Sequence, residues 1–340
     1  MSGIWIQGGD FMIRLASIGT NFITDWLLEG VQELPDIELT AVYSRSLEKG
    51  KEFAAKYGVK KVYDNYEEMA KDPDIDAVYV ASPTSCHYTH AVTMLNYGKH
   101  VLCEKPVCSN REELDLLIQT AKDHDVIFME AMKNVHSPGF HAIMENLDKI
   151  GPVRRATIQY CQYSSRYDKY KKGIVENAFN PKLSNGALMD IGSYCVHFLA
   201  SLFGAPKKIL ADSVFLSNGV DGSGSIIASY EDRQAELMYS KITNSKLPTQ
   251  IQGEKGCMII KECPIIKEIK ILYNDGTEED LEFEFRDNPM IYETMDFIRL
   301  IKEHKVDHEF LESSRIEMDI TDEARRQTGI VFPADKIKEQ

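Results

Sequence analysis

Short apolar runs alternate with helix-spaced apolar residues along the first part of the chain. The runs cover residues 13–18, 37–43, 76–81, 100–103 and 126–132. Between the first two runs, one helix face is formed by Ile23, Trp26, Leu27, Val31 and Leu34. Because strands and helices alternate without hairpin signals, we expect a parallel sheet that is covered by helices on both faces.

The pattern changes beyond residue 150. Strand-like segments cover residues 153–163, 208–216, 223–230, 234–242, 250–261 and 266–273. Helices are expected over 190–203, which Gly204 closes, and over 292–303 and 314–327. Turn signals such as Asp221-Gly222 separate some of the consecutive strands. This half therefore predicts an α+β unit with a large, mostly antiparallel open sheet.

One apolar run ends in the tripeptide Glu104-Lys105-Pro106. Proline cannot donate to a strand ladder, so the strand ends there. Lys105 is thereby placed at the carboxyl edge of a buried strand, where open α/β sheets bind ligands. A surface lysine in an ion pair would show the same tripeptide, so this feature alone does not establish a site.

The first apolar run leads into Gly19-Thr20-Asn21-Phe22-Ile23-Thr24. A strand, a glycine turn and a helix in this order are the context of a dinucleotide-binding fingerprint. Asn21 and Thr24 replace the second and third glycines of that fingerprint. Asn21 tolerates a positive φ better than most residues, so the turn remains possible. An ordinary strand–helix turn is the alternative.

The second apolar run ends at Ser44-Arg45. NAD-binding enzymes usually place an acidic residue near this position, where it binds the ribose 2′-hydroxyl group. A hydroxyl and a guanidinium would instead hold a 2′-phosphate. This pair favours NADP as the cofactor, with NAD possible; an exposed loop arginine is the alternative.

The third run is followed by Ser82-Pro83-Thr84 and then by His87 and His90. We expect His87 to cap or line a cofactor cleft, or to be a structural histidine. No third ligand lies nearby in the sequence, so no metal site is predicted. Residues 109–112, Ser-Asn-Arg-Glu, match a capping box for the next helix.

Composition narrows the classes of partner. The chain has 340 residues, 43% of them hydrophobic, and a net charge of −14, which suits two apolar cores and argues against nucleic acid as a partner. No apolar run reaches membrane-spanning length. The seven cysteines lack metal-ligand spacing and are expected to be reduced thiols of a cytoplasmic protein.

Several motifs together resemble the glucose-fructose oxidoreductase/inositol dehydrogenase/MocA superfamily. They are Gly19 to Ile23, Ser82-Pro83 with His87, Gly98 to Pro106, Asn180-Pro181 and Gly186 to Tyr194, which contains Asp-Ile-Gly-Ser-Tyr. The tail, Arg325 to Pro333, is similar to the dimeric dihydrodiol dehydrogenase branch. The match covers about residues 12 to 335. The resemblance implies a Rossmann doubly wound domain over 12–134 and a substrate-binding and dimerisation domain over 135–340. Residues 1–11 are interpreted as a dispensable or artificial leader, since Met12 is a better start.

The resemblance also implies roles for individual residues. Lys105 lies near the nicotinamide and assists proton transfer, Tyr194 is the general acid-base, and Asp190 positions the substrate or the tyrosine. His197, three residues beyond Tyr194, is the rival proton donor. The expected cofactor-binding residues are Gly19, Thr20, Asn21, Phe22, Ile23, Ser44, Arg45, Ser82, Pro83, Thr84, His87, Glu104 and Lys105. A lysine ammonium near Tyr194 is expected to lower the pKa of the tyrosine.

Some positions depart from the pattern of the family. Thr84 stands where many members have asparagine, and Val135 stands where the dihydrodiol branch often has arginine. These departures leave the substrate class open. The polar, aromatic segment 162–185 suits a substrate rim, although a mobile connection would have the same composition.

The combined reading is an NADP-preferring oxidoreductase that acts on a sugar, polyol, dihydrodiol or small carbonyl compound. Two alternatives remain at this point: a non-enzymatic dinucleotide sensor, and a glycoside hydrolase that uses transient oxidation by a bound nicotinamide. A sensor would need neither Lys105 nor Tyr194. The family pattern further implies a homodimer or a larger homo-oligomer built on the outer face of the second sheet.

Overall fold

The computed structural model describes residues 12–335, so the leader predicted over 1–11 lies outside the described residues. The strands are β1 (Ile13–Ile18), β2 (Ile37–Tyr43), β3 (Lys61–Tyr63), β4 (Ala77–Val80), β5 (His100–Glu104), β6 (Phe128–Ala131), β7 (Val153–Cys161), β8 (Lys208–Phe215), β9 (Asp221–Ser229), β10 (Gln234–Ser240), β11 (Thr249–Gly253), β12 (Gly256–Ile260), β13 (Ile269–Tyr273) and β14 (Glu278–Asp280). The α-helices are α1 (Phe22–Val31), α2 (Leu47–Lys56), α3 (Tyr66–Ala70), α4 (His87–Asn96), α5 (Arg111–Asp123), α6 (Pro138–Asn146), α7 (Tyr167–Lys171), α8 (Ser193–Phe203), α9 (Met290–Glu303) and α10 (Phe310–Thr328).

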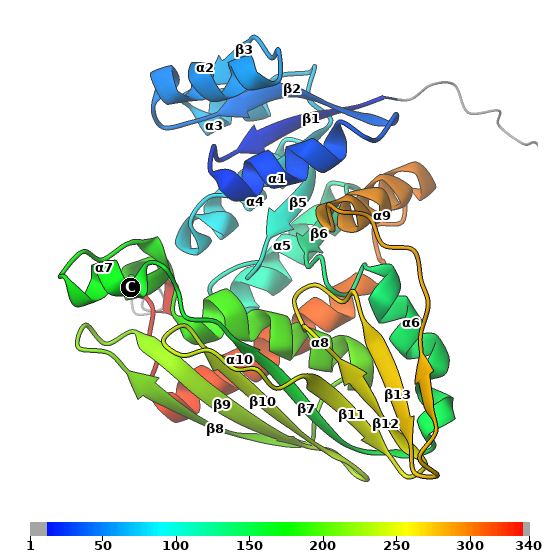
Figure 1. The fold of residues 1–340 in the computed structure, drawn as a ribbon. Coiled ribbons are helices and arrows are strands. Elements are labelled where there is room, and N and C mark those ends of the chain that lie inside the picture. The colour runs from blue at the N-terminus through cyan, green and yellow to red at the C-terminus, as the bar shows by residue number, and fades with distance from the viewer. Residues whose placement is uncertain (1–11, 336–340) are drawn as a thin grey trace, which may run out of the picture.

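The first sheet has six parallel strands in the order β3-β2-β1-β4-β5-β6 (Figure 1). The strand order reverses between β1 and β4, which is the topological switch point where doubly wound sheets bind ligands. The predicted parallel sheet is confirmed. The strand β3 was not predicted, because its three half-buried residues carry no apolar run.

The second sheet has eight strands in the order β14-β13-β12-β11-β7-β10-β9-β8. Only β7 and β10 pair in parallel, so the predicted mostly antiparallel sheet is confirmed. The prediction of one strand over 250–261 is wrong. This segment is a hairpin of β11 and β12, because the polar residues Glu254 and Lys255 form a two-residue turn that the apolar pattern on both sides concealed.

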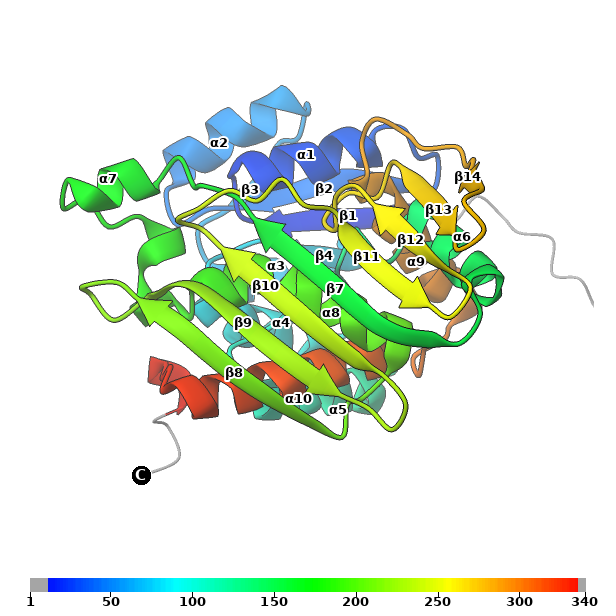
Figure 2. The same ribbon diagram turned by 60° about the horizontal axis from the view of Figure 1, so that its bottom comes forward.

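Helices α8 and α10 lie between the two sheets (Figure 1). The largest apolar cluster joins α8 to the inner face of the second sheet, with Phe198 and Leu199 fully buried. Helix α10 also contacts β8 and α5, so it connects both units. Figure 2 shows the outer face of the second sheet without a helix over it in the described chain.

Helix α9 returns to the first unit. Its residues Met290, Phe297 and Leu300 join the apolar cluster of β1 and α1, and Gly30 approaches the backbone of Ile291 closely. A segment distant in sequence therefore completes one covering layer of the parallel sheet. This arrangement brings the fully buried Glu293 of α9 near Glu104 and Lys133.

Helix α5 has a capping box that lies one residue beyond the predicted one. Asn110, not Ser109, is the N-cap, and its side chain accepts a hydrogen bond from the Glu113 N–H at 3.0 Å. Glu113 reaches back to the Ser109 N–H at 2.8 Å. Asparagine caps helices as well as serine does, so the sequence allowed both registers.

Candidate active site

A pocket of about 750 Å³ opens at the carboxyl edge of the parallel sheet. Residues from both units line it. The parallel sheet contributes Asn21, Phe22, Ile23, Trp26, Ala81, Ser82, Pro83, Thr84, His87, Glu104, Lys105, Pro106 and Lys133, and the second unit contributes Tyr160, Gln162, Tyr163, Ser164, Ser165, Arg166, Asn177, Ala178, Asn185, Asp190, Ile191, Tyr194 and Lys241. Eleven of the predicted site residues therefore line one cavity: Asn21, Phe22, Ile23, Ser82, Pro83, Thr84, His87, Glu104, Lys105, Asp190 and Tyr194.

The glycine turn between β1 and α1 forms one wall. Gly19 has a φ of 123°, and a Cβ atom there would lie 2.7 Å from the Ala81 carbonyl oxygen. Only glycine fits this position. Asn21 does not need a positive φ, contrary to the prediction: its φ is −99°, and its side chain caps α1 by accepting hydrogen bonds from Ile23 N–H and Thr24 N–H. The turn therefore leaves the N-terminus of α1 facing the pocket, which suits a phosphate.

The segment after β4 forms the next part of the wall. The His87 ring lies between two carbonyl oxygens, with Nδ1 3.0 Å from the Pro106 oxygen and Nε2 2.7 Å from the Ser82 oxygen. Burial lowers the pKa of His87, so this histidine stays neutral. It joins the ends of β4 and β5 behind the pocket, and Thr84 is buried beside it.

Ser44 and Arg45 lie beyond this cavity, at the carboxyl end of β2. The Ser44 hydroxyl accepts a hydrogen bond from Ser46 N–H at 3.3 Å, and Ser46 caps α2. Gly19 N–H donates to the Tyr43 oxygen at 3.4 Å, so the end of β2 lies beside the glycine turn. The Arg45 side chain is exposed. A hydroxyl, a guanidinium and a helix N-terminus are thus available next to the turn.

Lys105 bridges the two units. Its ammonium group donates to the Asp190 carbonyl oxygen at 2.5 Å and to Asp190 Oδ1 at 3.2 Å. Lys241 donates to Asp190 Oδ2 at 2.5 Å and to the Ala178 oxygen at 2.7 Å. Although burial opposes it, the two ammonium groups lower the pKa of Asp190, which stays ionised. Asp190 belongs to a π-helical turn, Leu188–Gly192, that precedes α8.

Tyr194 lies in the first turn of α8 and is 6% exposed. Its ring packs edge-on against Tyr160, with ring centroids 5.7 Å apart. The Lys105 ammonium lies 4.7 Å from the centroid of the Tyr194 ring, over its face. The hydroxyl accepts a hydrogen bond from a different residue, Lys133.

The expectation that lysine lowers the pKa of Tyr194 is wrong for this structure. Burial and the nearby Glu104 carboxylate raise that pKa well above its usual value. Tyr194 is therefore a protonated hydroxyl here, suited to donating a proton. It becomes a base only when another group takes its own proton.

Sequence reasoning missed Lys133 and Lys241. Lys133 comes two residues after the end of β6, at the same sheet edge as Lys105, and this placement is the signal that could have identified it. Lys241 follows β10 and carried no local signal, because its partner Asp190 is distant in sequence.

Glu104, at the end of β5, is a buried carboxyl group in the wall of the same pocket. Tyr79 of β4 donates to Glu104 Oε1 at 2.5 Å, and Lys105 N–H donates to Oε2 at 3.3 Å. Burial raises the pKa of Glu104. The acidic residue of the tripeptide therefore holds the strand end that presents Lys105.

His197, the rival proton donor, does not line this pocket. It is buried between helices α8 and α10, where Nδ1 lies 2.7 Å from Glu317 Oε2 and 3.5 Å from Glu130 Oε2. Although burial opposes it, hydrogen bonds with Glu130 and Glu317 raise the pKa of His197 to about 9. Glu130, His197 and Glu317 lie close enough to share a cation, and a protonated His197 already supplies a positive charge there. This cluster joins β6, α8 and α10.

The predicted substrate rim does reach the pocket. Gln162 to Arg166 line one side of it, and helix α7 continues outward from them. Tyr167 and Tyr170 of α7 stack near Phe179, with centroids 5.8 and 5.6 Å from that ring. This aromatic packing gives the rim a fixed shape at its base.

Both halves of the chain match known families. A sequence model described as "Oxidoreductase family, NAD-binding Rossmann fold" matches residues 13–132. A second, described as "GFO/IDH/MocA C-terminal domain", matches residues 145–259. Together they span most of the described chain.

Curated relatives match almost end to end. The chain is 48% identical over 327 residues to scyllo-inositol 2-dehydrogenase (NADP(+)) IolU of Bacillus subtilis (strain 168), which covers 96% of this chain and 100% of that protein. It is 42% identical, with the same coverage, to the uncharacterized oxidoreductase YgjR of Escherichia coli (strain K12). Trans-1,2-dihydrobenzene-1,2-diol dehydrogenase of Xenopus tropicalis is 32% identical over 88% of this chain and 92% of its own length.

Solved structures share the fold. The chain superposes on KijD10, a 3-ketoreductase from Actinomadura kijaniata in complex with NADP and TDP-benzene, with a TM-score of 0.84 at 22% identity, covering 94% of this chain and 99% of that one. Biliverdin reductase from Synechocystis sp. PCC 6803, in complex with biliverdin and NADP+, gives a TM-score of 0.78 at 18% identity, covering 93% and 99%. These similarities show that the chain shares its two-unit fold with both proteins.

Proposed function

This chain belongs to the GFO/IDH/MocA oxidoreductase family, and we propose that its pocket binds NADP(H) and exchanges a hydride with a polyol, diol or related carbonyl compound. The proposal rests on one observation: Lys105 of the first unit contacts Asp190 and the ring of Tyr194 of the second unit. The turn at Gly19, where a side chain would clash with the Ala81 carbonyl group, forms a wall of the same site. A family member that served only as a dinucleotide sensor would not need this polar cluster.

The described residues fit a dinucleotide. The glycine turn and the N-terminus of α1 suit the pyrophosphate, while Ser82, Pro83 and Thr84 line the way to Lys105. A bound nicotinamide would supply the hydride acceptor or donor. The chain's own task is to hold the reacting carbon and to move a proton at its oxygen.

Tyr194 is the residue proposed to move that proton. Its protonated hydroxyl can donate to a carbonyl oxygen as that oxygen gains negative charge, and in the reverse direction it receives a proton from an alcohol. Lys105 and Asp190 hold the substrate side of the pocket, because each is fixed by the other across the two units. We assign Lys105, Asp190 and Tyr194 as the catalytic residues on this basis.

The proposed cofactor preference is NADP(H) over NAD(H). Its support is the absence of an acidic residue at Ser44 and Arg45, the hydroxyl and guanidinium there, and the N-terminus of α2 beyond Ser46. A relative 48% identical to this chain is named as an NADP(+) enzyme, which agrees with this preference.

The proposed substrates are cyclic polyols and vicinal diols. The support is the names of two relatives, one acting on scyllo-inositol and the other on a trans-dihydrodiol of benzene. The rim and the two lysines at Asp190 offer several polar groups to neighbouring hydroxyls, which suits such compounds.

We further propose a homodimer or larger homo-oligomer in the cytoplasm. Leu210 of β8 and Ile227 of β9 pair across the outer face of the second sheet and are 59% and 38% exposed, so an apolar area is available there. A monomeric mass by light scattering at micromolar concentration would contradict this.

All seven cysteines are free thiols, which fits a reducing compartment. Within residues 12–335, no helix is long and apolar enough to cross a membrane.

Two measurements test the proposed function. Titration of NADPH and NADH by fluorescence should show tighter binding of NADPH. A panel containing scyllo-inositol, other inositols and trans-dihydrodiols, incubated with NADP+, should produce NADPH with at least one member. Equal affinity for both cofactors would remove the preference, and tight cofactor binding without turnover on any diol, polyol or matching ketone would favour a sensor.

A further inference from the structure

The hydroxyl of Tyr194 is in contact with Lys133, not with Lys105. Lys133 is 7% exposed, and its ammonium group also lies 4.2 Å from the centroid of the Tyr194 ring. Trp26 of α1 is also near, with the ammonium 5.6 Å from its ring centroid. The amine is therefore buried beside two aromatic rings and in contact with the oxygen that is proposed to move a proton.

Several of the elements around Lys133 present an ionisable group to it. Glu104 and Lys105 come from the end of β5, Asp190 from the π-helical turn, and Glu293 from α9, besides Tyr194 itself. Glu293 is fully buried, and neither of its carboxylate oxygens has a hydrogen-bond partner among the described residues. Burial and the nearby Glu104 raise the pKa of Glu293 well above its usual range.

These surroundings weaken the hold of Lys133 on its proton. Burial and the neighbouring Lys105 ammonium lower the pKa of Lys133 to about 8, against the opposing effect of Glu104 and Glu293. Both the ammonium and the amine forms are therefore populated near neutral pH. Lys105 is differently placed, because its ammonium is held by the carbonyl and carboxylate oxygens of Asp190.

We propose that Lys133 is the proton-exchange partner of Tyr194, so that the hydroxyl regains its proton from a buried amine that contacts it in the wall of the pocket. This inference rests on the proposed oxidoreductase function. Lys133 acts through Tyr194 and is therefore a positioning and proton-exchange residue, while Tyr194 remains the group at the substrate.

The step balances in both directions. In reduction, the carbonyl carbon gains a hydride from the reduced nicotinamide, the carbonyl oxygen takes the Tyr194 proton, and Tyr194 takes a proton from the Lys133 ammonium, which becomes an amine. In oxidation, the alcohol carbon would give up its hydride to a bound oxidised nicotinamide, its hydroxyl proton would pass to Tyr194, and the Tyr194 proton would pass to the Lys133 amine, which becomes an ammonium. Oxidation therefore needs Lys133 neutral, and reduction needs it charged.

The first test observes the amine directly in the protein without cofactor. Among the resonances of lysine carrying ¹³C at Cε, one that titrates near pH 8 should be present in the wild type and missing in Lys133→Met. Lys133→Arg serves the same assignment if the methionine variant does not fold. Lys99→Met is the matched control, since Lys99 is also buried but donates to the Asp72 and Ile75 carbonyl oxygens outside the pocket. A Lys133 resonance that titrates near the ordinary lysine value of about 10.4 would overturn the proposal.

The second test uses pH profiles of turnover. The wild-type rate of oxidation should rise through about pH 8 and the rate of reduction should fall, because the two directions need opposite forms of Lys133. Lys133→Met should lose this titration and turn over roughly 10²-fold more slowly. Lys133→Arg, which keeps the charge but does not release a proton, should also lose it, and Lys99→Met should keep it.

The two failures are distinguishable. If Lys133→Arg keeps the wild-type rate and profile in both directions, Lys133 only places the tyrosine ring, and the proposal is wrong while the oxidoreductase function stands. If wild-type protein binds NADPH but turns over no substrate, the proposed function fails, and the NMR titration still decides the state of Lys133.

Discussion

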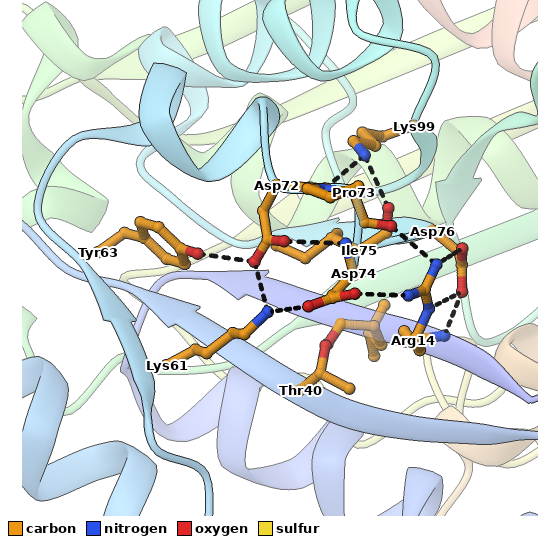
Figure 3. Close-up of polar contacts among 11 residues, drawn as sticks. Arg14, Thr40, Lys61, Tyr63, Asp72, Pro73, Asp74, Ile75, Asp76 and Lys99 are labelled. Atoms are coloured by element: carbon orange, nitrogen blue, oxygen red, sulfur yellow. Dashed lines mark hydrogen bonds and ion pairs between the residues drawn. The ribbon is translucent and has the colours of Figure 1, made fainter.

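The two edges of the parallel sheet both gather charged side chains, but they treat them in opposite ways. At the amino edge, Asp76 accepts two hydrogen bonds from the Arg14 guanidinium, at 2.7 and 2.9 Å (Figure 3). Lys61 lies 2.9 Å from Asp72 and 2.7 Å from Asp74. These pairs are partly exposed and every carboxylate has a cation.

At the carboxyl edge, the groups are buried and their pairing is incomplete. Lys133 contacts a tyrosine hydroxyl instead of a carboxylate, and Glu293 has no hydrogen-bond partner within residues 12–335. The pKa shifts differ accordingly. Hydrogen bonds from Lys61 and Tyr63, against burial, lower the pKa of Asp72 to about 2, whereas burial lowers the pKa of Lys133 to about 8.

The opposite directions of the pKa shifts suit the two edges to different tasks. Shifts that favour the charged form stabilise the fold, while shifts that favour the neutral form make proton transfer possible near neutral pH. Two residues are exceptions to this pattern. Asp190 at the carboxyl edge is kept ionised by two lysines, and burial lowers the pKa of Lys99 at the amino edge, although Asp72 and Asp76 oppose this.

The largest effect on turnover is expected when the contact between the two units at Lys105 is removed. Lys105→Met should reduce turnover by roughly 10² or more and also weaken NADPH binding, since it removes the contact with Asp190 at the cofactor-facing strand end. The double variant with Tyr194→Phe should lose far less than the sum of the two single losses, because both residues serve one step. Additive losses in steady-state kinetics would show that the two residues act separately.

An intermediate effect is expected at Ser44, at the carboxyl end of β2 and away from the lysines of the pocket. Ser44→Asp places a carboxylate where the proposed 2′-phosphate lies, so NADPH binding should weaken by about tenfold, or ~1.4 kcal/mol, through charge repulsion. NADH binding should change little. Ser46, the N-cap of α2, offers the control substitution Ser46→Asp, which keeps the cap and adds the same charge two residues further on. Equal weakening of both cofactors by Ser44→Asp would argue against the preference.

The smallest effect on activity is expected at the amino edge. Asp76→Ala removes the partner of the Arg14 guanidinium and of the Arg14 N–H, so the free energy of unfolding should fall by about 2 kcal/mol, measured by urea denaturation. Turnover by the folded protein should be unchanged. A loss of turnover comparable to that of Lys105→Met would break the distinction between the edges.

Low pH should destabilise the protein through the same amino edge. The pKa of Asp72 is about 2 in the folded chain, below the value of about 3.9 expected when it is unfolded. Its contribution to stability is therefore present above about pH 4 and is lost as the pH falls toward 2. Lys61→Met should reduce that acid-dependent loss, as unfolding curves at several pH values would show.

The sequence predicted what local patterns encode. Period and turn chemistry identified the parallel sheet, the glycine turn and the placement of Lys105 at the carboxyl edge, and the motif pattern identified Tyr194 and Asp190. The sequence could not identify Lys241, because its partner Asp190 lies 51 residues away. It could not identify Glu293 either, because α9 packs against α1 of the first unit although it is distant in sequence. The hairpin of β11 and β12 was missed because an apolar pattern continues on both sides of its short turn.

Val135 illustrates a residue whose interpretation depended on the fold. It stands where the dihydrodiol branch often has arginine, and the structure buries it in the apolar cluster of the second unit, while the nearby Lys133 lines the pocket. Lys133, two positions before Val135, thus supplies the polar group at the carboxyl edge. Such a shift between neighbours cannot be read from residue types alone.

The account depends most on the hydroxyl of Tyr194, and single-turnover hydride transfer measures its contribution directly. Tyr194→Phe keeps the ring packed against Tyr160, so NADPH should bind with wild-type affinity. Hydride transfer from bound NADPH to the ketone of the best substrate should be slower by roughly 10² or more. Transfer at the wild-type rate with a normally bound cofactor would contradict the assignment of Tyr194 as the residue that moves the proton.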